Sequence, residues 1–323
     1  MAPSTSETSP GLAPPRIIWP DGKSFAFTIF DDPDFQSVER GARVYEFLRE
    51  HGFRATKGVW PGDRSLPDSE RRVTCADPGY LKWVKGLQES GFEIGWHGAS
   101  PQTSLRAQTL AAFDVFRDLF GEFPKAISQH YECRENLYWG DLRLTAGLHR
   151  FLYNVVTRWK NHRAFHGHVP GHPMYWGDVC RDRVKYVRNF VFADVNTIAA
   201  CPFMPYHDPA RPAVNYWYAS SEGHNLEAFT RMLSEANQDR LEAEGGACIM
   251  YSHFAYGFVQ DGTLNARFRE LMGRLAKRNG WFVTVSELLD YIATNRPPFE
   301  FGPDLRNALE RRWLMHKLRF GTA

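Results

Sequence analysis

Acidic and histidine side chains follow four of the strands predicted from this sequence. Asp31 and Asp32 come directly after the apolar run SFAFTIF, His97 follows FEIGW, His130 follows KAISQ, and His253 follows ACIMYS. Carboxylates and imidazoles act as proton acceptors, proton donors and ligands of divalent metals. Any one of them could be an ordinary loop or capping residue. Their repetition after successive strands predicts one shared site.

Short apolar runs alternate with helical patterns along most of the chain. The runs expected to be strands are residues 24–30, 54–60, 92–96, 125–129, 151–157, 186–195, 247–252 and 280–285. Helical spacing between them is supported by capping residues, such as Asp77 before Pro78. This alternation predicts parallel strands with helices outside, in an α/β barrel or a doubly wound sheet. Chemistry in such folds takes place at the carboxyl ends of the strands.

The ends and the middle of the chain differ from this regular pattern. Residues 1–16 are rich in Pro, Ser and Thr, which predicts a disordered arm before a barrel domain at 17–299. The middle contains an irregular loop, NHRAFHGHVPGHPMYWGD, and one helix is expected at 225–243. Residues 300–323 predict a helical tail that packs on the barrel or on a partner subunit, with a membrane-surface helix as the alternative.

Composition excludes several classes of function. Lys and Arg number 39 and Asp and Glu 37, so the net charge of +2 does not indicate a nucleic-acid partner. No stretch approaches the roughly 20 apolar residues of a membrane span. Five scattered cysteines and an N-terminus without a secretory signal predict reduced thiols in the cytoplasm.

Three motifs resemble those of the polysaccharide deacetylase family, the NodB-homology or carbohydrate esterase 4 group. TIFDDPD resembles the first motif, T-F-D-D-G; EIGWHGAS resembles the second, a strand ending in Gly-x-His; IMYSHFAYG resembles the last, an apolar strand ending in His. Their order and spacing agree from Arg16 to Ile292. The resemblance implies a distorted (β/α)7 barrel that hydrolyses an N- or O-linked acetyl group of a sugar.

The resemblance also implies a role for each matching residue. Asp31 would be the general base and His253 the general acid, while Asp32 and His97 would bind a divalent metal, zinc being favoured. Such a metal lowers the pKa of a bound water toward about 7. A carboxylate then takes a proton from the water, and a protonated histidine donates one to the leaving group.

The sequence departs from the family pattern at three places. Pro101 stands where the second motif has its second histidine, Pro33 replaces the glycine of the first motif, and ISQHYECREN replaces an Arg-Pro pair. One interpretation is that His130 completes the metal site, with the histidines of the irregular loop as the next candidates: His166, His168 and His172. The others are metal-independent cleavage of an amide or ureide and a catalytically inactive sugar-binding protein.

Aromatic residues near the strand ends are candidates for substrate binding. Trp60, Trp96, Tyr131 and Trp176 would form a platform for sugar rings, or else pack in the core. Arg134 would contact an acidic or phosphorylated sugar. The expected partner is a carbohydrate, lipid- or nucleotide-linked in one interpretation, in glycan or surface-polysaccharide biosynthesis, and a homo-oligomer is also considered. No role is assigned to the loop at 162–172.

Overall fold

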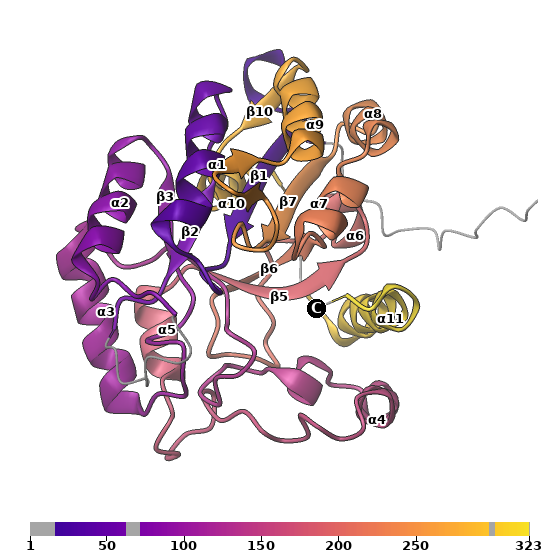
Figure 1. The fold of residues 1–323 in the computed structure, drawn as a ribbon. Coiled ribbons are helices and arrows are strands. Elements are labelled where there is room, and N and C mark those ends of the chain that lie inside the picture. Colours follow the sequence, from indigo (N-terminus) through magenta and orange to yellow (C-terminus); the bar gives the residue numbers. More distant parts are fainter. Residues whose placement is uncertain (1–16, 63–71, 297–300, 323) are drawn as a thin grey trace, which may run out of the picture.

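Parallel strands form the centre of the fold in a computed structural model that describes residues 17–62, 72–296 and 301–322 (Figure 1). The predicted arm at 1–16 lies outside the described residues. The barrel strands are β1 (Phe25–Asp31), β2 (Thr56–Val59), β3 (Glu93–Trp96), β4 (Ala126–Ile127), β5 (Tyr186–Phe192), β6 (Tyr216–Ser221) and β7 (Ala247–Ser252). They neighbour one another in chain order.

The barrel closes at β1, which contacts three strands. Residues 26–31 of β1 pair in parallel with 247–252 of β7, which joins the last strand to the first. β10 (Gly280–Phe282) pairs with the beginning of β1, and β2 pairs only with its end, at Phe30 and Asp31. The additional strand displaces β2 along β1, so the barrel is irregular there. The predicted distorted (β/α)7 barrel is confirmed.

Helices surround the barrel (Figure 1). They are α1 (Val38–Glu50), α2 (Pro78–Glu89), α3 (Arg106–Phe120), α4 (Gly147–Val156), α5 (Gly177–Arg183), α6 (Thr197–Ala200), α7 (Leu226–Met232), α8 (Glu235–Ala243), α9 (Ala266–Ala276), α10 (Val285–Thr294) and α11 (Pro303–Phe320). A short hairpin, β8 (Val259–Gln260) and β9 (Thr263–Leu264), follows β7. Asp77 caps α2 as predicted, since its side chain accepts a hydrogen bond from the backbone of Tyr80.

Two of the expected elements were wrong, and one strand was missed. Residues 151–157 belong largely to α4 and not to a strand; β-branched and aromatic residues favour strands locally, but here the apolar residues recur at helical spacing. The missed strand is β6, whose residues Tyr216–Ser221 lie in the irregular middle of the sequence. The helix expected at 225–243 is two helices, α7 and α8, that meet at Leu233 and Ser234.

The C-terminal helix packs against the barrel. Trp313 of α11 is fully buried, and its ring lies 5.0 Å from the ring of Phe190 in β5 and 5.8 Å from that of Tyr153 in α4. Glu310 accepts hydrogen bonds from Arg211 and Thr145. The structure thus gives the predicted tail a place on the barrel. Within the described ranges, no helix is both long enough and apolar enough to cross a bilayer.

We predict that Trp313→Ala lowers the free energy of unfolding by about 3–5 kcal/mol, because it removes a fully buried ring and leaves a cavity. Urea denaturation followed by circular dichroism measures the change. Met315→Ala, on the same helix but at a side chain that is 63% exposed, is the matched control and should stay within about 0.5 kcal/mol of the parent. Equal losses in the two variants would show that α11 does not depend on this contact.

Candidate active site

One carboxylate lies at the centre of three histidines at the carboxyl ends of the strands. The Nε2 atoms of His97, His130 and His253 lie 3.2, 3.0 and 3.3 Å from the carboxylate oxygens of Asp34. All four side chains are buried. The structure therefore brings together the three histidines expected from the sequence, but around a residue that the sequence analysis missed. Asp34 could have been found from the sequence, because it is the third acid of DDPD and lies two residues beyond Asp32.

The charge of Asp34 is balanced by these histidines. Burial alone would raise the pKa of its carboxyl group, but hydrogen bonds, those from His130 and His253 first, outweigh it and hold the pKa well below its usual value. Asp34 is therefore an anion in this site. It follows the end of β1 by three residues, in the turn that contains Pro33.

Hydrogen bonds behind His97 determine which of its nitrogens carries a proton. The hydroxyl of Ser128 donates to Asp32 at 2.7 Å, so the Ser128 oxygen must accept from Nδ1 of His97, 2.6 Å away. Burial lowers the pKa of His97, which favours the neutral ring. The Nε2 lone pair of His97 then faces an oxygen of Asp34 with no hydrogen between them. Two acceptors in this arrangement require a proton or a cation.

His253 is arranged for the opposite protonation state. Its Nδ1 donates to the backbone oxygen of His224 at 2.7 Å, and its Nε2 faces Asp34. Burial would lower the pKa of His253, but the hydrogen bond to Asp34 and the charges of Asp34 and Asp32 outweigh it and raise the pKa. His253 thus holds a second proton more readily than a free histidine does.

His130 completes the group from the end of β4. Its Nδ1 lies 3.5 Å from the sulfur of Cys133, and the guanidinium of Arg72 lies 3.4 Å from its Nε2. The buried ring of Trp60 lies 5.6 Å from the rings of both His97 and His130. Trp60 is therefore an apolar wall behind the two imidazoles.

Asp32, expected as a metal ligand, is paired with a fixed cation. The guanidinium of Arg188, from β5, lies 2.5 Å from its Oδ2, and both side chains are buried. Burial would raise the pKa of Asp32, but the charge of Arg188 outweighs it and the pKa is lowered. An oxygen of Asp32 still lies within 4.8 Å of the ligand atoms of Asp34 and His253. The sequence did not mark Arg188 as a site residue, because it lies within an apolar run and not at the end of a strand.

Asp31, expected as the general base, faces away from this group. Its carboxylate accepts from Lys57 at 2.7 Å, from the hydroxyl of Tyr45 at 3.0 Å and from the backbone nitrogen of Phe254 at 2.8 Å. It is fully buried, and burial raises its pKa against the opposing charge of Lys57. Three donors therefore already bind the carboxylate of Asp31.

The donor set suits a divalent metal. Asp34, His97 and His130 each offer one ligand atom, and these atoms lie within 4.8 Å of one another. The unpartnered lone pair of His97 against the anion of Asp34 is the arrangement that a cation would stabilise. Nitrogen and carboxylate ligands, three from the protein, are typical of catalytic zinc. Asp32, the ligand expected from the sequence, belongs to a second potential group, with Asp34 and His253.

The remaining candidates are more dispersed. Trp96 stacks on Phe113 at 4.2 Å, and the Trp176 indole donates to the backbone of Glu135, so both are buried core residues with no face open to a sugar. Tyr131 is 57% exposed beside His130. Arg134 is exposed, with its guanidinium 5.7 Å from the ring of Phe165.

The histidines of the irregular loop do not join the Asp34 group. The rings of His166 and His172 stack on each other at 4.2 Å. His168 instead accepts a hydrogen bond from the backbone of Tyr138. Within the part of the chain that the structure describes, neither of the potential metal groups includes them.

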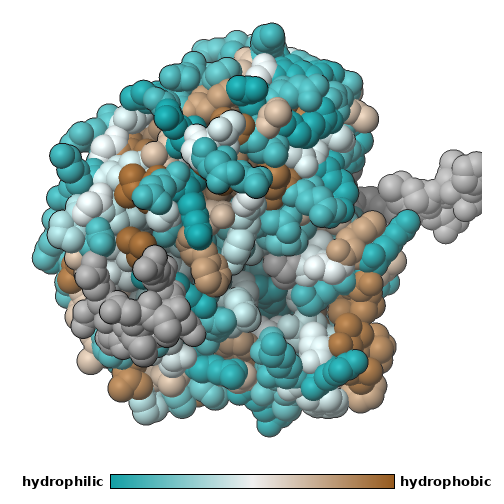
Figure 2. All heavy atoms as spheres, viewed as in Figure 1, coloured by the Kyte–Doolittle hydropathy of each residue, from teal (hydrophilic) through white to brown (hydrophobic). Residues whose placement is uncertain are grey.

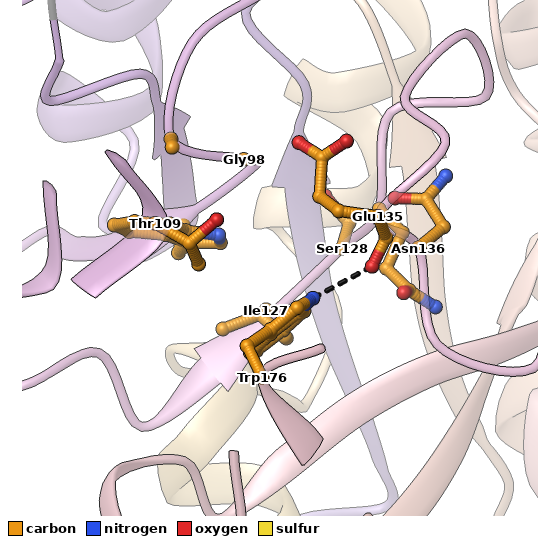
Figure 3. A pocket seen from close by; sticks show the side chains of 10 residues that line it. Gly98, Thr109, Ile127, Ser128, Glu135, Asn136 and Trp176 are labelled. Atoms are coloured by element: carbon orange, nitrogen blue, oxygen red, sulfur yellow. Dashed lines mark hydrogen bonds between the residues drawn. The ribbon is translucent and has the colours of Figure 1, made fainter. Parts of the chain in front are cut away.

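A small cavity lies behind the site (Figure 3). It has a volume of about 10 Å³, and Ser128, which holds His97, lies on its wall with Gly98 and Glu135. That volume is comparable to one water molecule. Burial raises the pKa of Glu135 from 4.5 to about 7. Glu135, whose carboxyl group changes charge near neutral pH, therefore lines the same cavity as Ser128, which hydrogen-bonds to His97.

We predict that Glu135 makes stability depend on pH. Its folded pKa of about 7 exceeds the 4.5 of a free carboxyl, so its contribution is fully present below about pH 4.5 and is lost as pH rises through about 7. Glu135→Gln removes this term. The variant should gain up to about 3 kcal/mol relative to the parent between pH 5 and pH 8. Urea denaturation of both proteins at each pH gives this difference, and a constant difference would contradict the prediction.

Comparison with known proteins supports the fold. No protein-family model matches the chain, and no curated protein matches its sequence. A Mycobacterium smegmatis protein assigned as a polysaccharide deacetylase matches with a TM-score of 0.53 and 13% identity, over 92% of this chain and 100% of that one. A Puue allantoinase matches with 0.52 and 13%, over 90% and 97%.

A third structure, assigned as a polysaccharide deacetylase of Pseudomonas aeruginosa PAO1, matches with a TM-score of 0.52 and 13% identity, over 89% of this chain and 96% of that one. At such identity the likeness concerns the fold alone. It agrees with the architecture that the motifs of the sequence implied. The chain has the fold of the polysaccharide deacetylases.

Proposed function

We propose that this chain is a hydrolase that removes an acyl group, bound through nitrogen or oxygen, from a sugar. The observation that carries the proposal is the convergence of Asp34 with His97, His130 and His253 at the carboxyl ends of four strands, with Asp32 beside them. The names of the similar structures, two polysaccharide deacetylases and an allantoinase, support hydrolysis of this kind. A lipid- or nucleotide-linked sugar in cytoplasmic glycan assembly remains the proposed substrate class.

A divalent metal, zinc by its ligand chemistry, would be held by Asp34, His97 and His130. When bound, it supplies a water with a pKa near about 7 and polarises the acyl oxygen. The chain itself keeps Nε2 of His97 free for this purpose, through the hydrogen bonds of Ser128 and Asp32.

Asp32 is the proposed proton acceptor. Its lowered pKa keeps it ionised, and Arg188 fixes its orientation next to Asp34 and His253. This role moves from Asp31, whose oxygens are occupied by Lys57, Tyr45 and the backbone of Phe254. His253, with its raised pKa, donates a proton to the leaving nitrogen or oxygen.

Hydrolysis without a metal is the second candidate. The buried charge of Arg188 against Asp32 provides a fixed cation next to the site, and the proton of His253 can bridge to Asp34. In this version the proton that His97 and Asp34 need between them takes the place of the metal, and His97 and Asp32 orient the attacking water. A sugar-binding protein without activity is the third interpretation and is decided by the same experiments.

We predict that Asp34→Asn and Asp32→Asn separate metal binding from catalysis. Zinc titrated calorimetrically into metal-free protein should bind the parent and lose at least about 100-fold in affinity in Asp34→Asn, which removes a ligand. Asp32→Asn should weaken zinc only about 10–100-fold, as loss of an outer hydrogen bond does. At saturating zinc, the turnover of acetylated chito-oligosaccharides by Asp32→Asn should still fall by about 10²–10⁴.

Asp31→Asn is the matched control, because it changes the adjacent carboxylate. It leaves Lys57 buried without its anion, so it should lower stability by about 3–5 kcal/mol while the folded fraction retains turnover. Undiminished turnover in Asp32→Asn would contradict the assigned base. Turnover by the parent with no zinc bound would favour the metal-independent version. Tight binding of an acetylated sugar with no cleavage, zinc present, would favour the binding protein.

We also predict a dependence on the leaving group for His253→Ala. Cleavage of an acetamido sugar, whose amine must be protonated as it leaves, should slow by about 10²–10⁴. Cleavage of 4-nitrophenyl acetate should slow much less, because nitrophenolate leaves without a proton. Steady-state kinetics with both substrates gives the ratio, and equal losses would assign His253 a role other than proton donor.

A further inference from the structure

Helix α4 points its apolar residues toward solvent. Leu148, Phe151, Leu152, Val155 and Val156 are each between 40% and 69% exposed. They occupy positions i, i+3, i+4, i+7 and i+8, which form one continuous stripe on a helix. A surface helix normally buries such a stripe against the core.

The opposite side of α4 holds the helix to the protein. Tyr153 and Asn154 are buried, with Tyr153 stacked near Trp313 of α11 and Asn154 donating to Asp141. The orientation of α4 is therefore determined by specific contacts. Large exposed apolar patches that are held in place usually mark interaction sites.

The turn after α4 extends the stripe with an aromatic ring. Trp159 is 49% exposed, and its ring lies 6.3 Å from that of Phe151. Arg158 and Trp159 both have positive φ, at 52° and 59°, which is unfavourable for residues with a side chain. The backbone thus adopts a strained turn that places an indole beside the apolar stripe.

The exposed charges of this segment have one sign, since the acids that contact it, Asp141 and Glu310, are buried. Arg158, Lys160 and Arg163 are exposed, and no acidic residue occurs in the sequence from 142 to 177. The end of the neighbouring helix α11 is similar: beyond Glu310 its exposed residues are apolar or basic, namely Arg311, Arg312, Met315, Leu318, Arg319 and Phe320. Figure 2 shows brown spheres where Figure 1 has α4 and α11.

An apolar surface could bind a second copy of the chain or a membrane, and the basic residues around it distinguish the two. In a twofold contact between two copies, each patch meets its own copy, so Arg158 and Lys160 would approach identical cations. An anionic phospholipid surface instead attracts the basic residues, while Leu, Phe and Trp enter the boundary between headgroups and acyl chains.

We propose that α4 and the turn at 157–163, together with the end of α11, form a docking surface for anionic phospholipid membranes. The apolar stripe enters the interface and the basic residues contact lipid phosphates. The surface is independent of the proposed hydrolase function, because none of its residues belongs to the Asp34 group.

Sedimentation with phospholipid vesicles tests this proposal on the full chain. The parent should bind vesicles containing phosphatidylglycerol and bind pure phosphatidylcholine at least about tenfold more weakly, and the difference should shrink in high salt. The triple variant Leu148→Ser/Phe151→Ser/Val155→Ser should lose at least about tenfold in binding. Arg158→Glu/Lys160→Glu should lose about as much at low salt.

Matched changes elsewhere serve as controls. Leu105→Ser/Val115→Ser replaces exposed apolar residues outside this surface, and Lys82→Glu/Lys85→Glu reverses exposed charges on α2. Both should bind vesicles as the parent does, and circular dichroism should show every variant folded. Failure of the parent to bind anionic vesicles, or equal losses in the controls, would overturn the proposal. So would a parent dimer that the triple variant converts to monomer.

Discussion

The stability of the barrel at the end of β1 depends on the buried ion pair between Asp31 and Lys57. This pair joins the end of β1 to β2, and the same carboxylate accepts from the backbone of Phe254, just beyond β7. The strand that closes the barrel is thereby tied to both neighbours at its carboxyl end. Breaking such a pair leaves an uncompensated buried charge, which costs several kcal/mol. The end of β1, and the acids that follow it, are therefore rigidly held.

The negative charge of each acid at the end of β1 is balanced by a different partner. Three carboxylates lie close together along the chain, and each has its own partner: Asp31 has Lys57, Asp32 has Arg188, and Asp34 has the three histidines. Buried anions in one place would otherwise raise one another's pKa. Asp34 faces three groups that can release protons or bind a metal, and the proposed chemistry therefore centres on it.

The long connection between β4 and β5 links two features of the molecule. It begins near His130, passes Glu135 beside the small cavity, and then forms α4 with its exposed apolar stripe. One connection therefore contributes a side chain to the site and most of the proposed membrane surface. The rest of that surface comes from α11, which the barrel holds through the buried ring of Trp313.

The sequence by itself determined the elements whose signals are local. The apolar runs ending in Asp31, His97, His130 and His253 predicted strands and one shared end of a barrel, because parallel strands place their carboxyl ends together. The structure confirms the barrel and places the three histidines together. Exceptions arose where local preference misled, as in α4, whose β-branched and aromatic residues favour a strand in isolation.

Only the tertiary structure decided which partners each acid has. Asp31, Asp32 and Asp34 are almost alike in the sequence, and they differ by the partners that distant elements bring: Lys57 from β2, Arg188 from β5, and histidines from three strand ends. The direction in which α4 faces was decided in the same way, since helical periodicity defines a stripe but not whether the stripe points inward. Pairing and burial are non-local, and local patterns carry no information about them.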